Sequence, residues 1–293
     1  MNTLPTAKNG YDGKGVGTAY LRTHSSALLE EYLKKYRLIA EKIVSNTPKG
    51  LLQSRVTILG CGNGVLESCI LIELAKQRIA HSISQDINVR LIDINRKFLC
   101  QAREEIFRQL AKHSTVNFEL VCGDFVNPVF FETGEKEIVL MLGCTFGNLG
   151  SDEGKFIAAL NNLAQGSLLA IDMQRRKTCS NNPEKIRKVE PVCTGVVTDE
   201  HCAWFQEILR GKVGRKRRIG TTFFGEPTTE NFGGISGGYR IVANAIMGEQ
   251  KISLLSFGRY GRNAVVRSFE NDGWRSVWRT TKDGYHTFVF VKG

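Results

Sequence analysis

The stretch VTILGCGNG, residues 56–64, determines how the rest of the chain is interpreted. Its first four residues are apolar or β-branched, which is typical of a short buried strand. Gly60, Gly62 and Gly64 follow at alternate positions. Glycine adopts positive φ without strain and allows a ligand to approach the backbone closely. The pattern therefore predicts a strand-to-helix turn, although it does not by itself separate a ligand-binding turn from a packing turn.

Strands and helices alternate around this stretch. Strands are expected at residues 56–59, 88–94, 116–122, 137–142 and 167–173, and helices at residues 25–44, 66–80, 96–113 and 152–163. Such alternation implies right-handed crossovers and a parallel, doubly wound sheet. The expected fold class is α/β, Rossmann-like, with a smaller α+β region.

The regular alternation of strands and helices ends after residue 174. A helix is expected at residues 200–210, followed by strands at residues 239–247, 251–257, 276–280 and 286–291. Asp283-Gly284 is a hairpin signal between the last two strands. We expect four segments: an N-terminal arm and helix that covers the substrate (1–50), the ligand-binding domain (51–174), a lid or insertion (175–240) and C-terminal strands that complete the substrate region (241–293).

Acidic residues follow two of the other strands. Asp93 ends the second, where a carboxylate can accept both hydroxyls of a ribose, and Asp124 with Phe125 follows the third, where they can bind an adenine. Gly143 and Cys144 follow the fourth. The carboxyl ends of parallel strands form a ligand cleft.

The glycine turn suits three roles: a dinucleotide site, a methyl-donor site or a packing turn that binds no ligand. Asp93 follows Gly64 at a longer interval than the roughly 20 residues typical of a dinucleotide fold, and the turn carries no positive charge to bind phosphate. Together with the acids, this favours an S-adenosylmethionine site.

The sequence around the fourth strand resembles the histidine-specific methyltransferase family. LGCTFGN, residues 142–148, is similar to that family's Leu-Gly-x-Thr-Ile-Gly-Asn motif, and Asp172 ends the next strand as an aspartate does in the family. The resemblance is clear over residues 56–174. It implies a class I methyltransferase that uses S-adenosylmethionine.

The resemblance also implies residue roles. The glycines of the first turn would face the methionine part of the cofactor, and Gly143 and Asn148 would contact the amino acid portion of the substrate. Asn148 has a structural alternative as a helix N-cap or turn residue. Tyrosines of the N-terminal region would cover the substrate, and Tyr36 and Tyr20 are the candidates, with core or surface aromatics as the alternative.

One departure from the family bears on the substrate. The family's histidine binders carry a Glu-x-Ser after a Gly-Glu pair, whereas here Gly248-Glu249 leads into KISLLSFGRY, which contains Arg259 and no acid. A tyrosine expected in residues 191–197 is also missing. We therefore expect a substrate other than histidine.

Composition adds limits. The net charge is +11, concentrated in residues 175–240 and above all in KVGRKRR, residues 212–218. This basic segment suits either a solvated loop or an anionic partner.

The eight cysteines include no CxxC pair, and Cys179, Cys193, His201 and Cys202 match no common zinc spacing. We expect no metal, no membrane span and a cytoplasmic protein.

The main functional hypothesis is therefore N-methylation of an amine on an amino acid or amino-acid-derived small molecule. The first alternative is a methyltransferase acting on RNA or a protein through the basic segment. However, the Asn/Asp-Pro-Pro-aromatic motif of amino methyltransferases for nucleic acids is missing after the fourth strand. A non-catalytic cofactor-binding protein is the second alternative. The oligomeric state is not indicated.

Overall fold

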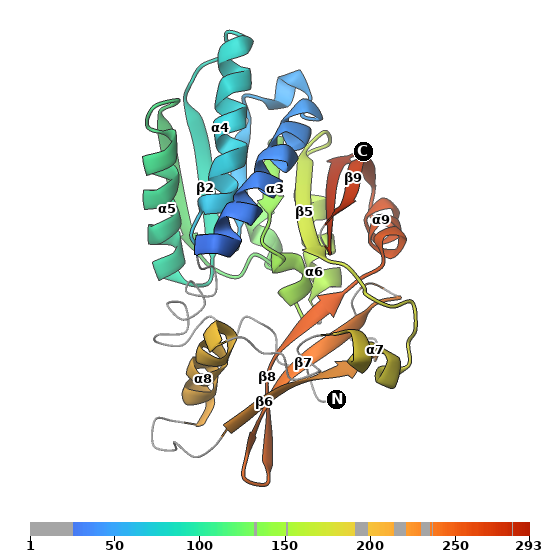
Figure 1. Ribbon diagram of the computed structural model, residues 1–293. Coiled ribbons are helices and arrows are strands. Elements are labelled where there is room, and N and C mark those ends of the chain that lie inside the picture. The colour runs from blue at the N-terminus through green and yellow to red at the C-terminus, as the bar shows by residue number, and fades with distance from the viewer. Residues whose placement is uncertain are drawn as a thin grey trace. The chain divides into compact units, whose positions relative to one another are not determined.

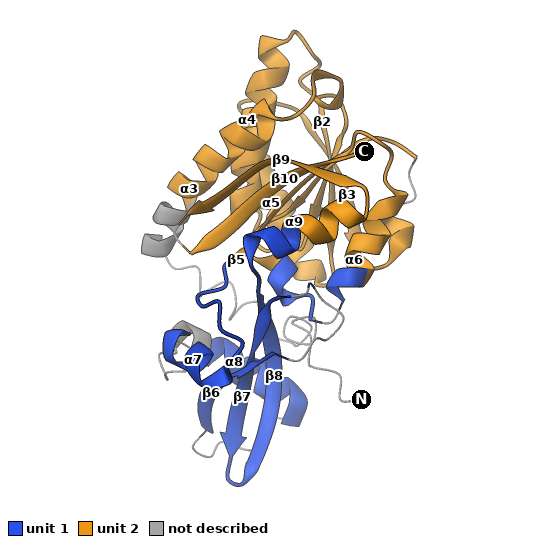
Figure 2. Cartoon of the chain, turned by 90° about the vertical axis from the view of Figure 1, so that its right-hand side faces the viewer, with its two compact units in different colours: residues 1–24, 146–154, 174–265 blue, residues 25–145, 155–173, 266–293 orange. Residues whose placement is uncertain are grey.

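The structure is a computed structural model that describes residues 26–131, 134–150, 152–190, 199–213, 221–229, 235, 237–282 and 284–293. The chain divides into two compact units (Figure 2). The large unit contains residues 25–145, 155–173 and 266–293, and the small unit contains residues 1–24, 146–154 and 174–265.

The large unit is built on a seven-stranded sheet in the order β3-β2-β1-β4-β5-β10-β9 (Figure 1). Its strands are β1 (Arg55–Leu59), β2 (Ile87–Asp93), β3 (Val116–Cys122), β4 (Glu137–Met141), β5 (Leu168–Gln174), β9 (Trp274–Lys282) and β10 (Tyr285–Lys292). β1 to β5 pair in parallel, while β9 and β10 form an antiparallel hairpin. The α/β fold class predicted from the sequence is confirmed.

Helices α3 (Ser26–Ser45), α4 (Val65–Ala80) and α5 (Arg96–Leu110) pack side by side, with α4 in the middle (Figure 1). Local signals set their ends: the Asn95 side chain caps α5 by accepting a hydrogen bond from the Lys97 N–H at 3.0 Å. The strands beneath are apolar, and every residue of β4 is buried.

The helix expected at residues 152–163 is shorter than predicted. It forms α6 (Glu153–Ala159) and a 3₁₀ turn, η4 (Leu160–Asn162). Three further 3₁₀ turns are η1 (Lys49–Leu51), η2 (Pro128–Phe131) and η3 (Thr145–Asn148). Three elements have no counterpart in the sequence prediction: α7 (Pro183–Val189), β6 (Thr221–Thr228) and α9 (Arg262–Asn271).

The C-terminal strands are divided between the two units. β7 (Tyr239–Met247) and β8 (Gln250–Arg259) join the small unit, whereas β9 and β10 extend the large sheet, with β10 next to β5. The hairpin expected from Asp283-Gly284 is present, although Asp283 lies outside the described residues. The segment expected at residues 241–293 therefore differs from the division seen here.

The small unit contains an antiparallel sheet in the order β6-β7-β8 and helices α7 and α8 (Asp199–Val213). α8 packs its aromatic face on this sheet, and the shared core is formed by Trp204, Phe205, Ile208, Leu209, Phe223, Ala243, Ala245, Leu254 and Leu255. A second contact is polar: the buried Arg240 guanidinium bonds to the Glu153 carboxylate and, at 3.0 Å, to the Tyr260 hydroxyl. Each unit thus has its own core.

No helix in the described part of the chain is long and apolar enough to cross a bilayer.

Candidate cofactor site

The turn between β1 and α4 has the backbone that its glycines predict. Gly60, Gly62 and Gly64 have φ values of 64°, 50° and 75°. A Cβ on Gly60 would lie 2.7 Å from the Thr145 side chain, and one on Gly64 would lie 2.8 Å from the Ala102 backbone. At Gly62, in contrast, a Cβ would meet nothing within 4 Å. The outer two glycines allow tight packing, while the middle one leaves open space beside the backbone.

Asp93 lies beside this turn at the end of β2. Its side chain is buried, and Oδ1 accepts a hydrogen bond from the Asn95 N–H at 2.8 Å. Burial raises the pKa of this carboxyl to about 6, although backbone N–H groups of Asn95 and Gly62 partly oppose the rise. The Cys61 thiol lies 3.9 Å from Oδ2. Hydrogen bonds from the backbone of Asn95, Gly62 and Cys61 hold this carboxylate at the strand end, and a carboxylate held in this way can also accept hydrogen bonds from a ligand.

The loop after β3 contains Asp124 and Phe125. The Gly123 N–H donates to the Asp93 carbonyl at 3.0 Å, which holds this loop next to the end of β2. Asp124 is partly exposed and Oδ1 accepts from the Val126 N–H at 3.3 Å. The Phe125 ring is 8% exposed and packs edge-on against Phe156, with 6.1 Å between ring centroids. Phe125 is therefore largely a core residue in this structure.

Gly143 and Cys144 form a sharp turn after β4. Their φ values are 69° and 65°, so Cys144 adopts a left-handed backbone that costs free energy in a residue with a Cβ. The Cys144 N–H donates to Asp172 Oδ1 at 2.8 Å, and the Thr145 hydroxyl donates to the Leu142 carbonyl at 2.8 Å. These bonds fix the turn at the same sheet edge as Asp93.

Tyr36, on α3, contacts this turn through its hydroxyl group. It is 1% exposed, its hydroxyl donates to the Asp172 carboxylate, and the Gly143 N–H donates to the Tyr36 oxygen at 3.4 Å. Burial and the neighbouring Asp172 raise the Tyr36 pKa well above its ordinary value. In this structure Tyr36 supports the β4 turn. Tyr20, the other candidate, lies outside the described residues.

Asn148 is the last residue of η3 and is partly exposed. It belongs to the small unit, where the Phe146 and Tyr260 rings lie 6.0 Å apart and a Cβ on Gly147 would lie 3.1 Å from the Gly258 carbonyl oxygen. A role as N-cap of the next helix is not supported, because α6 begins only at Glu153.

Sequence reasoning missed two charged side chains at this edge. Lys35 Nζ lies 3.9 Å from Asp172 Oδ2 and 3.8 Å from the centroid of the Tyr285 ring. Glu67, in the first turn of α4, is 3% exposed. The one sequence signal for Glu67 is its place as an acid at a helix start just after a glycine turn. This signal is not specific, because acids at helix starts are common on surfaces, where they interact favourably with the helix dipole.

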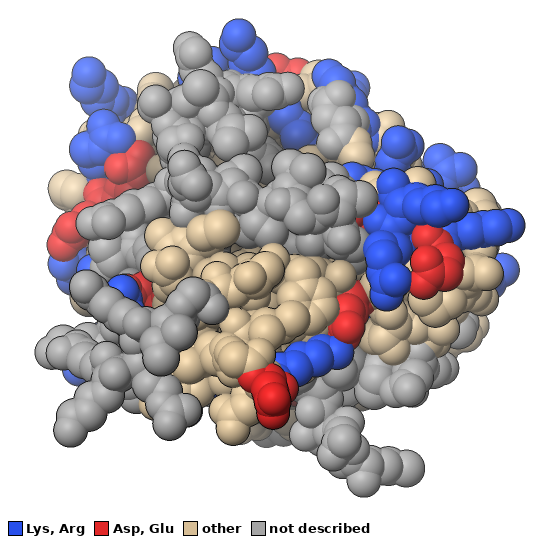
Figure 3. Space-filling model, turned by 60° about the horizontal axis from the view of Figure 1, so that its bottom comes forward, with Lys and Arg blue, Asp and Glu red and all other residues tan. Residues whose placement is uncertain are grey.

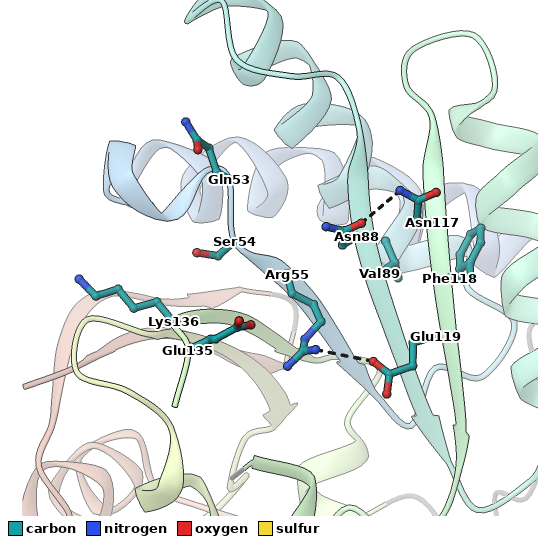
Figure 4. Close-up of a pocket in the computed structure, with 10 residues that line it drawn as sticks. All are labelled: Gln53, Ser54, Arg55, Asn88, Val89, Asn117, Phe118, Glu119, Glu135 and Lys136. Atoms are coloured by element: carbon teal, nitrogen blue, oxygen red, sulfur yellow. Dashed lines mark hydrogen bonds and ion pairs between the residues drawn. The ribbon is translucent and has the colours of Figure 1, made fainter. Parts of the chain in front are cut away.

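A hollow lies at the opposite edge of the sheet, where β1, β2 and β3 begin (Figure 4). Its volume is about 580 Å³. Among its lining residues, Arg55 lies 3.7 Å from the Glu119 carboxylate, and the Asn117 amide donates to the Asn88 side-chain oxygen at 3.2 Å. Arg55 also contacts the fully buried Glu137 at 2.5 Å. None of the residues expected to bind the cofactor lies there.

No group of three or more His, Cys, Asp or Glu that could hold a metal ion occurs among the described residues.

The mostly parallel seven-stranded sheet with flanking helices is the fold expected of a class I S-adenosylmethionine-dependent methyltransferase. Residues 20–182 match the family described as histidine-specific methyltransferase, SAM-dependent. The match spans more than half of the chain, which therefore belongs to this family and is a methyltransferase that uses S-adenosylmethionine.

Solved structures give distant similarities, and the search among curated proteins gave no match. An S-adenosylmethionine-dependent methyltransferase from Clostridium acetobutylicum is 14% identical, with 90% of this chain and 92% of that chain covered and a TM-score of 0.49. Magnesium protoporphyrin IX methyltransferase from Synechocystis PCC 6803 with bound SAH is 12% identical, with 97% of each chain covered and a TM-score of 0.49. A glycopeptide N-methyltransferase is 11% identical, with 88% and 87% covered and a TM-score of 0.44.

Proposed function

We propose that the protein methylates an amine of an amino acid or an amino-acid-derived small molecule, and that this substrate is not histidine. The observation that carries the proposal is the polar edge at the ends of β2, β4 and β5, with Asp93 and Asp172 buried there beside two glycine turns. Buried polar groups of this kind suit a small, charged nucleoside and an amine better than a purely apolar surface.

The cofactor assignments follow the order of the strands. Gly60, Gly62 and Gly64 are assigned to the methionine part of S-adenosylmethionine, and the open space at Gly62 supports this. Asp93 is assigned to the ribose hydroxyls, and Asp124 with Phe125 to the adenine. Gly143 and Cys144 complete the cofactor site, and Asn148 is assigned with Gly143 to the amino acid portion of the substrate.

The protein's contribution to the reaction is mainly positional. Bound S-adenosylmethionine supplies a methyl group that its sulfonium already activates, so a neutral amine must be held in line with it at about 3 Å. The β4 turn, fixed by its bond to Asp172, offers backbone groups for orienting the substrate. The amine must arrive without its extra proton or lose it to water or a nearby group. No single base is assigned.

The exclusion of histidine rests on β8. After Glu249 this strand carries no acid, and Leu254 and Leu255 are fully buried in the small unit. Arg259 is turned toward an acid, with its Nε 3.6 Å from the Glu190 carboxylate. An imidazole seeking a carboxylate partner would find none contributed by this strand.

The alternative is methylation of RNA or a protein through a basic surface. On the face drawn in Figure 3, the described Lys and Arg side chains lie around the margin, and uncharged residues form the middle. Most of the segment 212–218 lies outside the described residues. The alternative predicts RNA binding that weakens steeply with salt.

A methylation assay tests both proposals. Purified protein with labelled S-adenosylmethionine is offered amino acids including histidine, polyamines, short peptides and total RNA, and label is followed into each. We expect transfer to one amine class and none to histidine. Transfer to histidine, or label in RNA alone, would overturn the proposal.

A further inference from the structure

The first turn of α4 carries a carboxylate that the cofactor assignments above do not use. Glu67 is 3% exposed and lies in the first turn of α4, just after Gly64. Its own backbone N–H partly stabilises the ionised carboxylate. Ionising a buried carboxyl costs several kcal/mol unless it is paired. Burial accordingly raises the Glu67 pKa from 4.5 to about 8.

The charged neighbours of Glu67 are acids. Asp93 from β2 and Asp172 from β5 both raise its pKa, and Glu67 in turn raises the pKa of the Cys61 thiol. Lys35 lies against Asp172, and Arg37 of α3 lowers the pKa of the Cys69 thiol, which Glu67 raises. Within the described ranges Glu67 forms no ion pair. The edge therefore holds more buried acids than cations that could balance them once they ionise.

The other two acids already have partners or an assigned role. Asp172 accepts hydrogen bonds from the Tyr36 hydroxyl and the Cys144 N–H, and Asp93 is placed for the ribose. The methyl donor brings a sulfonium and an α-ammonium group. The first turn of α4 lies close to the β4 turn, because a Cβ on Gly143 would be 3.8 Å from Leu66.

We propose that the carboxylate of Glu67 binds the α-ammonium group of the methyl donor's methionine moiety. The proposal rests on the cofactor site assigned above to the carboxyl edge of the sheet. A charge-assisted hydrogen bond between ammonium and carboxylate in a dry cleft is stronger than a neutral one, and the bound cation offsets the cost of the buried charge. Glu67 is protonated in the free protein at neutral pH, so it releases that proton to solvent when the ammonium binds.

Two ligands that differ only in the amino acid part test this role by calorimetry. S-Adenosylhomocysteine carries the α-ammonium, whereas 5′-methylthioadenosine keeps the nucleoside and the thioether without it. In the Glu67→Gln variant we expect binding of S-adenosylhomocysteine to weaken by about 10- to 100-fold, with 5′-methylthioadenosine affinity nearly unchanged. Glu73→Gln, on the same helix but paired with Lys76 at 3.0 Å, is the matched control and should bind both ligands normally.

Proton release gives a second readout. Titrations near pH 7 in buffers of different ionisation enthalpy should show wild-type protein releasing close to one proton with S-adenosylhomocysteine and fewer with 5′-methylthioadenosine. The Glu67→Gln variant should lose this difference. Equal weakening of both ligands, unchanged affinity for S-adenosylhomocysteine, or equal proton release with both ligands would each overturn the proposal.

The Asp93→Ala variant separates failure of this role from failure of the site. If it binds neither ligand well while Glu67→Gln binds S-adenosylhomocysteine normally, the site stands and only the role of Glu67 is wrong. If Asp93→Ala binds both ligands normally, the cofactor site lies elsewhere and both assignments fall.

Discussion

The two ends of the parallel strands balance their charges in different ways. At the amino ends, Arg55 lines the hollow and contacts both Glu119 and Glu137, and the Thr57 hydroxyl donates to Glu137 at 2.5 Å. At the carboxyl ends, Glu67 and Asp93 are buried acids whose pKa values rise to about 8 and about 6. The buried acids with raised pKa values support the ligand site proposed at the carboxyl ends, whereas the hollow at the amino ends holds no such group among its described lining residues.

The largest expected effect concerns Glu67 in the free protein. Its folded-state pKa of about 8 lies above the ordinary 4.5, so the folded protein keeps a proton that the unfolded chain has already lost. The free energy of unfolding therefore falls as pH rises from about 4.5 to about 8. The Glu67→Gln variant has no proton to lose at this position, so its free energy of unfolding does not fall in this way. We expect the difference in free energy of unfolding, variant minus wild type, to increase by on the order of 4 kcal/mol between pH 5 and pH 8.5.

Urea unfolding at the two pH values measures that gain. Other titrating groups are common to both proteins and cancel in the comparison. Parallel stability curves for the two proteins would mean that Glu67 is not the strained acid described here.

Asp93→Ala is expected to have the next largest effect, and it concerns affinity. Loss of a buried acceptor for two ribose hydroxyls should raise the Kd for S-adenosylhomocysteine about 100-fold, or about 2.7 kcal/mol. Calorimetry measures the Kd, and Asp86→Ala, at an exposed position one strand-length away, serves as the control. An unchanged Kd would remove Asp93 from the site.

Tyr36→Phe tests the support beneath the β4 turn. The change removes a donor to the fully buried Asp172 carboxylate, and an unsatisfied buried acceptor costs about 1–3 kcal/mol. We expect the urea midpoint to fall accordingly and the Kd for S-adenosylhomocysteine to rise only modestly. A variant as stable as wild type would indicate that the Cys144 N–H and Lys35 are sufficient for Asp172.

The smallest effect on cofactor affinity should come from the amino ends. Arg55→Met leaves the fully buried Glu137 with the Thr57 hydroxyl but without its cation, and losing one partner of a buried ion pair costs about 3 kcal/mol. Because Arg55 is 23% exposed, we expect solvent to reduce this to about 2 kcal/mol in the free energy of unfolding, and we expect no change in cofactor affinity. A weakened Kd in this variant would break the contrast between the two edges.

Much of the large unit is predictable because its signals are local. Glycines and apolar runs set β1 to β5, and predicted strand ends agree with the structure within one or two residues. The expected positions of Asp93 and of the turn at Gly143 are likewise local, since each follows directly from the end of a strand. Their roles toward ligands stay predictions.

What could not be predicted depends on contacts distant in sequence. Glu67 has the appearance of an ordinary acid at a helix start, and only the tertiary structure buries it. Tyr36 meets Asp172 across 136 positions of sequence. β10 pairs beside β5 although the whole small-unit sheet lies between them in the chain. Periodicity within one segment carries no information about such partners.

The chain enters and leaves the main part of the small unit at one point. Arg175 and Tyr260 form a parallel bridge, and the Arg176 N–H donates to the Tyr260 carbonyl at 3.1 Å. The entropy cost of closing a loop grows only slowly with its length, by about 0.6 kcal/mol for each doubling. Insertions or deletions between these two joined ends should therefore leave the strand register of the large sheet unchanged.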